Sequence, residues 1–306
     1  GIEDVLKEHF DEENIVYWMA FQILMGNVDT QNRNVYLYSP LNSDIWYFIA
    51  WDNDGCLMRP EYELRNFSDQ NSWEKGISNY WGNILLQRCL KSRSFREKLN
   101  DAILDLREYL NKDMLTSKIE SYKNVLKPYL YLMPDAEYEP LTSEQYDQIA
   151  ASLPDEIEKN YQLYLESLET PMPFYIGVPT IDGDKLKFNW DVSYDLDAED
   201  ITYSVEVAGD YLFRDVIYQN TTLTVPEAEM DLPKAGQYFV RVRATNTSGK
   251  TQDAFDYYVT DEGKYSQISS FIISISNPNN LNRYSYFTKS VIFIVHSLFV
   301  PSAAVT

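Results

Sequence analysis

The chain has 306 residues, enough for two domains, and its 44% hydrophobic and 24% charged residues are typical of folded globular proteins. Its formal net charge of −21 argues against nucleic acid or an anionic membrane as the main partner, because both bind basic surfaces, whereas a basic protein partner is compatible with it. The chain has only two histidines and two cysteines, which argues against a zinc site, a histidine-based triad or a disulfide scaffold. Cys56 and Cys89 are expected to be free thiols, and any catalysis must depend on carboxylates.

The sequence opens on Gly1 without an initiator Met or a signal peptide, so we expect it to be part of a longer one. The first strong pattern is a helix at residues 12–25. Asp11 is a suitable N-cap, and acidic residues fill the first turn, where the positive end of the helix dipole favours them. Apolar side chains occur nearly all round this helix, which predicts that it is buried, and Gly26-Asn27 is expected to end it.

Two short segments rich in aromatic and β-branched residues follow, at residues 35–38 and 46–51, with turn residues between them. This pattern predicts a β-hairpin. Helical periodicity then predicts four helices, and Pro128 is expected to stop the third of them. These helices are expected at residues 83–90, 94–110, 115–126 and 143–168.

The composition changes at Pro171, after which alternating segments separated by turn residues predict a β-sandwich. The expected strands are at residues 185–190, 201–207, 216–218, 223–225, 238–244 and 255–259. After Glu262 the remaining 44 residues contain no Asp or Glu, although the preceding residues contain all 47. We therefore predict that residues 263–306 are a non-native or disordered hydrophobic tail. Its apolar stretch at residues 291–306 is short for a membrane span, so membrane anchoring is not expected.

The hairpin brings candidate catalytic residues together. If Tyr38 pairs with Phe48, the antiparallel register places Asn34 opposite Asp52. Asp29 lies in the loop before the hairpin, so a loop carboxylate, an amide and a second carboxylate meet at one end of it. Phosphoryl transfer uses such a set, because an Asp accepts or orients the proton of the attacking hydroxyl while an Asn and a second Asp hold Mg²⁺. The spacing from Asp29 to Asn34 is the D-x-x-x-x-N of protein kinases.

These motifs resemble the spore-coat protein H (CotH) kinase family. The resemblance covers residues 1–170, and its specific part is a Gly-Asn-x-Asp-x-x-x-x-Asn loop and a Trp-Asp-x-Asp-Gly strand end. It implies an atypical, secreted-type protein kinase that transfers phosphate from ATP to Ser or Thr of partner proteins, in an extracellular, cell-surface or spore-coat location. Carried over to this chain, the site residues are Asp29 as the catalytic Asp, Asn34 and Asp52 as cofactor-binding residues and Mg²⁺ ligands, and Asp54 as a further Mg²⁺ ligand.

The chain departs from ordinary protein kinases in two ways. Asn27 and Val28 replace the His-Arg before the catalytic Asp, and Asp-Asn-Asp-Gly replaces D-F-G; both changes are expected within this family. The chain also contains no G-x-G-x-x-G loop, no V-A-I-K-like strand and no G-x-x-x-x-G-K-[ST] loop. We therefore expect that the ATP-binding N-lobe is missing and that this chain is inactive alone, whereas the full-length protein is expected to be an enzyme.

Two other functions use the same features. A non-catalytic surface or spore-coat binding protein on a kinase-like scaffold agrees with the acidic charge, although the retained Asp29 argues against it. A carbohydrate-active enzyme would use Asp29 and Asp52 as its pair of carboxylates. The expected partner is a protein substrate, basic and Ser-rich, and the oligomeric state is left open.

Residues 171–262 resemble a fibronectin type III module. Trp190 stands where such sandwiches bury a Trp, and Tyr238 is placed to make the tyrosine corner. The predicted fold class is therefore α+β: a mostly helical kinase C-lobe with one hairpin at residues 1–170, then an all-β sandwich, then the tail.

Overall fold

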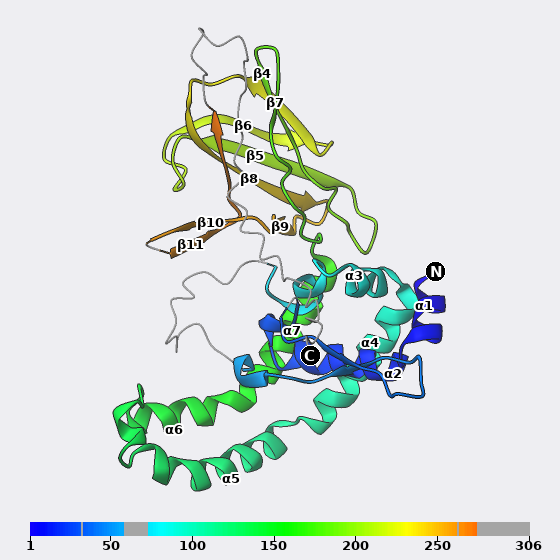
Figure 1. The fold of residues 1–306 in the computed structure, drawn as a ribbon, viewed down its shortest axis with the longest axis vertical. Helices are drawn as coiled ribbons and strands as arrows, with labels where there is room; N and C mark the ends of the chain where they lie inside the picture. Colours follow the sequence, from blue (N-terminus) through cyan, green and yellow to red (C-terminus); the bar gives the residue numbers. More distant parts are fainter. Residues whose placement is uncertain (32, 58–72, 262, 274–306) are drawn as a thin grey trace, which may run out of the picture.

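The computed structural model describes residues 1–31, 33–57, 73–261 and 263–273. It is 42% helical and 26% strand, which confirms the predicted α+β class. Figure 1 shows the helices gathered at one end of the molecule and most of the strands at the other. The apolar stretch at residues 291–306 lies outside the described residues, and no helix within them is long and apolar enough to cross a membrane.

The first part of the chain consists of helices joined by short 3₁₀ turns and one hairpin. The helices are α1 (Ile2–His9), α2 (Glu12–Leu24), α3 (Ile84–Lys91), α4 (Arg93–Tyr109), α5 (Lys112–Leu130), α6 (Ser143–Ser152) and α7 (Glu156–Glu169). The 3₁₀ turns used below are η1 (Val28–Gln31), η2 (Asn53–Gly55), η4 (Gly76–Tyr80), η5 (Asp135–Glu137) and η6 (Leu153–Asp155). The hairpin strands are β1 (Tyr36–Tyr38) and β2 (Tyr47–Ile49).

Helix α2 is the centre of the helical core. It begins where the sequence predicts, because the Asp11 side chain accepts a hydrogen bond of 2.9 Å from the Asn14 amide. Ile15, Met19 and Leu24 are fully buried, and α2 packs against α4 and α7. A helix held on so many sides fixes the position of the loop that follows it.

Two predictions about helix ends are wrong, and both concern proline. Pro128 lies inside α5: its missing amide removes one helical hydrogen bond in the last turn, and the helix nevertheless continues to Leu130. The helix predicted at residues 143–168 is two helices, α6 and α7, separated by η6. Pro154 lies in η6, where its fixed φ and missing amide favour a new start over a continuous helix.

The hairpin forms, but its register differs by one residue from the prediction, because Tyr38 pairs with Tyr47 rather than with Phe48. The cause lies in α2. The Asn14 side chain accepts a hydrogen bond from the Phe48 amide at 2.6 Å and donates one to the Phe48 carbonyl at 3.2 Å. The Phe48 ring is buried against Trp18, with 4.8 Å between the ring centroids. Contact with α2 thus fixes the position of β2, and hydrogen bonds of Ser43 with Ser39 and Pro40 shape the turn that precedes it.

The later residues form three sheets. Their strands are β3 (Thr180–Asp182), β4 (Lys185–Asn189), β5 (Ile201–Ala208), β6 (Val216–Leu223), β7 (Glu227–Asp231), β8 (Gly236–Asn246), β9 (Thr251–Asp253), β10 (Tyr257–Thr260), β11 (Gly263–Ser266) and β12 (Ser269–Ile273). The largest sheet has the order β12-β8-β5-β6 with β9 beside β8, the next is β3-β4-β7, and β10 pairs with β11. Residues 216–223 form one strand, β6, where the sequence predicted two separate strands at residues 216–218 and 223–225.

The two larger sheets share one hydrophobic core. Phe188 of β4 and Val205 of β5 belong to it, and the ring centroids of Phe188 and Phe271 are 5.8 Å apart. Phe271 lies in β12, which pairs with β8 beyond residue 262, where the sandwich was expected to end. The folded region therefore extends at least to Ile273.

The β region also contributes to the helical core. Phe255 is buried in it, with its ring centroid 5.0 Å from that of Trp73. The Gln252 side chain donates a hydrogen bond of 3.4 Å to the Ser78 hydroxyl of η4. The two regions are thus joined through side chains that are buried on both sides of their boundary.

Gly76 provides a test of the contact between η4 and α7. Its φ is +48°, and a Cβ placed on it would lie 2.1 Å from the Ser167 Oγ and 2.9 Å from the Tyr164 Cα. Gly76→Ala is therefore expected to lower the free energy of unfolding by about 2–4 kcal/mol, measured by urea denaturation. In the control Gly183→Ala, φ is +64° but the added Cβ meets open space, so a loss of only about 1 kcal/mol is expected. Equal losses in both variants would contradict the predicted clash.

Both cysteines are free, as the sequence predicts. Cys89 of α3 is buried, and burial, followed by the charge of Glu12, raises the pKa of its thiol from about 9 to about 12. At pH 8 the native thiolate fraction should be about 10³-fold below that of an unfolded chain, and should rise tenfold per pH unit up to about pH 12. Alkylation by iodoacetamide, followed by mass spectrometry, is expected to show this slope in the native protein and a plateau above pH 9 in urea. A native plateau near pH 9 would contradict the prediction.

Candidate active site

Asp29 lies in η1, directly after the central helix. Gly26 has a φ of +62° and turns the chain out of α2, and the Asn160 side chain of α7 donates a hydrogen bond of 2.9 Å to the Leu24 carbonyl at that helix end. Asn27 is buried, and its side-chain oxygen accepts a hydrogen bond of 3.3 Å from the Asp29 amide. The Asp29 side chain itself is exposed. The backbone is thus fixed while the carboxylate faces solvent.

Side chains from residues 79–83 hold the η1 loop from the other side. The Tyr80 hydroxyl is 3.0 Å from the Thr30 hydroxyl, and burial raises the pKa of Tyr80, so it remains a neutral hydrogen-bonding group. Asn79 donates a hydrogen bond to the Val28 carbonyl at 3.3 Å. Asn83, the N-cap of α3, donates one to the Gln31 carbonyl at 3.5 Å. These three contacts tie the backbone and the Thr30 side chain of the η1 loop to residues 79–83.

The Asp52–Gly55 segment is held beside the η1 loop by the side chain of Asn53. Its side-chain oxygen accepts hydrogen bonds from Gln22 at 3.1 Å and from Asn27 at 3.2 Å, which ties η2 to α2 and to the start of the η1 loop. A Cβ placed on Gly55 would lie 3.8 Å from Asp29 Oδ2 and 3.6 Å from Asn27 Oδ1. Two segments more than 20 residues apart in sequence therefore meet at the Asp29 carboxylate.

Asn34 and Asp52 flank the open end of the hairpin. Asn34 precedes β1 and Asp52 follows β2, and the rings of Tyr36 and Trp51, next to them in the chain, have centroids 5.4 Å apart. Both residues adopt left-handed backbone conformations, with φ values of 55° and 53°. Asn and Asp tolerate this region better than other non-glycine residues. The side chains of these two residues are therefore presented from turns and not from the strands.

The site contains three carboxylates. Within the part of the chain that the structure describes, the carboxylates of Asp29, Asp52 and Asp54 make no hydrogen bond or ion pair. Among these same residues, no group of three or more His, Cys, Asp or Glu is placed to hold a metal ion. The oxygen donors present at the site are carboxylates and the Asn34 amide. Hard oxygen donors of this kind, together with ligand phosphates and water, are what Mg²⁺ prefers.

Sequence reasoning missed the residues that join the loops. Gln22 is fully buried in an otherwise apolar stretch of α2, and such an isolated polar residue is a signal that could have been used. Asn53 stands between the two aspartates of the motif and was given no role. Asn79 and Tyr80 lie in a segment without clear periodicity, so nothing in the sequence indicated them.

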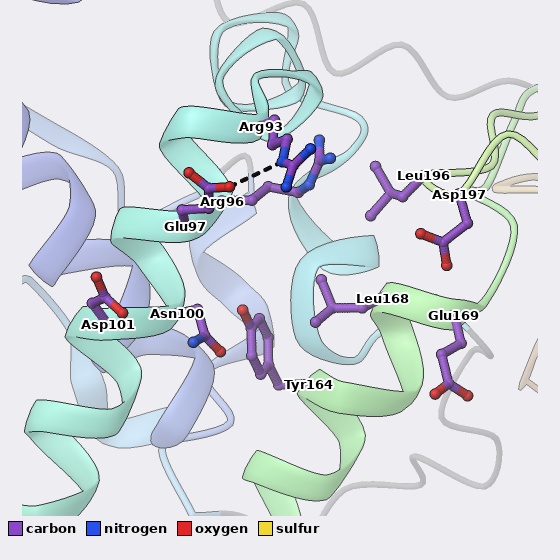
Figure 2. A pocket seen from close by; sticks show the side chains of 10 residues that line it. All are labelled: Arg93, Arg96, Glu97, Asn100, Asp101, Tyr164, Leu168, Glu169, Leu196 and Asp197. Carbon is purple, nitrogen blue, oxygen red and sulfur yellow. Dashed lines mark hydrogen bonds and ion pairs between the residues drawn. The ribbon is translucent and has the colours of Figure 1, made fainter.

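A separate pocket of about 370 Å³ lies between α4, α7 and the loop after β4 (Figure 2). Its lining residues are Arg93, Arg96, Glu97, Asn100, Asp101, Tyr164, Leu168, Glu169, Leu196 and Asp197. Arg93 pairs with Glu97 at 2.9 Å, and Arg96 donates a hydrogen bond of 2.7 Å to the Leu90 carbonyl. The predicted site residues do not line this pocket.

A family model described as "CotH kinase protein" matches residues 1–164. The chain belongs to this family. The CotH match contains η1, the hairpin and η2, and it ends within α7, before the β region. No curated protein matches the chain.

Among solved structures, the Twitchin kinase region from C. elegans is similar over 32% of this chain and 20% of that chain. The sequence identity is 17% and the TM-score is 0.22, so this likeness carries no argument about the site. The CotH match is thus the finding that relates the chain to kinases.

Proposed function

We propose that the chain carries the catalytic and metal-binding loops of an atypical protein kinase that transfers the γ-phosphate of ATP to Ser or Thr of a partner protein. One observation carries the proposal: the D-x-x-x-x-N loop and the W-D-x-D-G turn of a CotH family member meet at the Asp29 carboxylate. A Cβ placed on Gly55 of the turn would lie 3.8 Å from Asp29 Oδ2. An extracellular, cell-surface or spore-coat location is proposed with it, on the resemblance to secreted-type kinases.

The proposed roles follow from exposure and donor type. Asp29 is exposed on a fixed backbone, so it can accept or orient the proton of a substrate hydroxyl. Asn34 and Asp52 would hold Mg²⁺, with Asp54 as a further ligand, because together they offer amide and carboxylate oxygens without a competing cation among the described residues. When bound, Mg²⁺ neutralises charge on the nucleotide phosphates. The chain's contribution is to keep these donors in place through Asn53 and Gln22.

For the β region we propose a fibronectin type III-like sandwich that acts as a spacer or adhesive unit beside the kinase C-lobe. Tyr238 donates a hydrogen bond of 2.9 Å to the Lys234 carbonyl, as a tyrosine corner does, and Trp190 is buried. The proposal concerns architecture and assigns no ligand to this region.

The test uses the full-length gene product, because phosphoryl transfer also needs a nucleotide-binding loop, and neither the G-x-G-x-x-G nor the G-x-x-x-x-G-K-[ST] motif occurs in these 306 residues. Binding of ATP and autophosphorylation are measured with and without Mg²⁺, and transfer to a Ser- and Lys-rich peptide is measured beside a matched peptide in which Ala replaces Ser. We expect Mg²⁺-dependent binding and transfer to Ser. Absence of both would favour the non-catalytic binding protein on a kinase-like scaffold.

A further inference from the structure

Helices α5 and α6 form an arm that extends away from the other helices (Figure 1). The base of the arm is anchored, because Leu115 is buried in the helical core and Met114 and Ile119 pack against it. Further along, α5 packs against α6, η5 and η6. Most of the length of the arm thus lies beyond the core that holds its base.

One face of α5 carries apolar residues at alternating spacings of four and three, the pattern of a helix that packs lengthwise on another helix. We call the following residues the arm stripe: Leu115, Ile119, Tyr122, Leu126 and Tyr129 of α5, together with Met133, which lies just beyond the end of the helix. The first two are covered by the core, whereas the other four are exposed, Tyr122 by 63%, Leu126 by 52%, Tyr129 by 66% and Met133 by 74%. A surface that begins as core therefore continues uncovered along the arm.

In the arm, ion pairs lie between α5 and α6 and apolar side chains are exposed, which is the reverse of an isolated helical hairpin. Toward α6, Lys127 pairs with Asp147 at 2.6 Å, and Lys123 lies 3.9 Å from the same carboxylate. An unpartnered pair of helices is expected to bury its apolar face between them and to expose its ion pairs. Contiguous exposed apolar surface instead marks an interaction site.

The end of the arm is acidic. Residues 128–152 contain no Lys or Arg, and their five acidic residues are Asp135, Glu137, Glu139, Glu144 and Asp147, of which Asp147 pairs with Lys127. Asp135, Glu137 and Glu144 are exposed near the tip, close in sequence to the last residues of the arm stripe. Such a tip repels an acidic partner and attracts a basic one.

We propose that the arm stripe is the docking site of an amphipathic helix from a partner protein, with Leu, Ile or Phe at heptad spacing and Lys or Arg beside them. The heptad spacing of the stripe favours a helix as the partner, and the acidic tip favours Lys or Arg beside the apolar residues of that helix. This inference goes beyond phosphate transfer and does not depend on it, because it concerns binding alone.

The test is fluorescence anisotropy of a labelled synthetic peptide with the 306-residue chain, without ATP or Mg²⁺. The probe is an amphipathic helix about three heptads long, with Leu at positions a and d and Lys or Arg at e and g. One control peptide has Glu in place of Lys and Arg, and the other has Ser in place of Leu. We expect the probe to bind at least about tenfold more tightly than either control.

Variants of exposed residues then locate the site without disturbing the fold. Leu126→Ser with Tyr129→Ser should weaken probe binding at least about tenfold, whereas Val192→Ser, 72% exposed in the β region, should not. Glu137→Lys with Glu144→Lys should weaken binding of the probe and strengthen binding of the Glu peptide. Thermal unfolding should be unchanged in all of them.

Several results would overturn the proposal. These are equal binding of the three peptides, no binding of the probe, or loss of binding in Val192→Ser to the same extent. Concentration-dependent dimerisation by light scattering that Leu126→Ser with Tyr129→Ser abolishes would also overturn it, because a second copy would then cover the stripe. None of these results bears on the kinase proposal, which is measured by phosphate transfer.

Discussion

Replacement of Asp29 by Asn is expected to lower the rate of phosphate transfer by the full-length gene product about 10³-fold, because a general base contributes about this much. Asn keeps the size and the hydrogen-bonding geometry of the side chain but cannot take up the proton of the attacking hydroxyl. Since the Asp29 carboxylate has no partner among the described residues, the free energy of unfolding should be unchanged. The measurement is the initial rate of transfer from labelled ATP at saturating Mg²⁺.

The matched control is Asp44→Asn, an exposed aspartate in the hairpin loop just before β2, away from the open end. It removes the same charge from the same chain and should leave the rate unchanged. If Asp29→Asn kept more than a tenth of the activity, Asp29 would not be the proton acceptor, even in an active kinase. If both variants lost activity equally, the effect would come from net charge and not from the site.

Asp52→Asn is expected to remove the Mg²⁺ dependence of nucleotide binding and to lower the rate of transfer by about 10³-fold, since it replaces a charged metal ligand by a neutral one. Asn is the appropriate replacement because Asp52 has a φ of 53°, which Asn tolerates and Ala does not. Isothermal titration of ATP at several Mg²⁺ concentrations separates the loss of metal binding from any loss of fold.

Asp54→Asn serves as the comparison, because Asp54 is an exposed neighbour in the same turn and is proposed only as a further ligand. A smaller effect is expected from it, with activity partly restored at high Mg²⁺. If Asp54→Asn were the more damaging of the two, the assignment of the principal ligand would have to be exchanged. Unchanged binding in both would refute the metal site.

The elements that were predictable from sequence are those whose signals are local. Helix α2 was predicted from the Asp11 cap and the apolar surface. The hairpin was predicted from the aromatic runs before and after residues 39–45. The spacing of Asp29 and Asn34 and the order of the two motifs indicated the CotH family, whereas the roles of these residues stay a prediction. Each of these signals depends on residues within about two turns or one hairpin of each other.

What sequence could not predict depends on contacts between distant residues. The hairpin is anchored to α2 by Asn14, which binds the Phe48 backbone across 34 positions. The two site loops are joined by Asn53 with Gln22, a contact across 31 positions. Strand β12 was assigned to the tail because its composition lacks acids, although its apolar side chains complete the sheet core. The composition of a segment does not show which distant residues it packs against, and that packing determines whether it belongs to the fold.

The contact of Phe255 and Gln252 with the helical part has a consequence for how this protein can evolve. Ser78, which accepts the Gln252 hydrogen bond, precedes Asn79 and Tyr80, the residues that hold the Asp29 loop. A recombination event that exchanged the β region for an unrelated module would remove an aromatic side chain from the helical core, at a cost of about 3–5 kcal/mol. We therefore expect a replacement module to be tolerated better if it brings its own equivalent of Phe255.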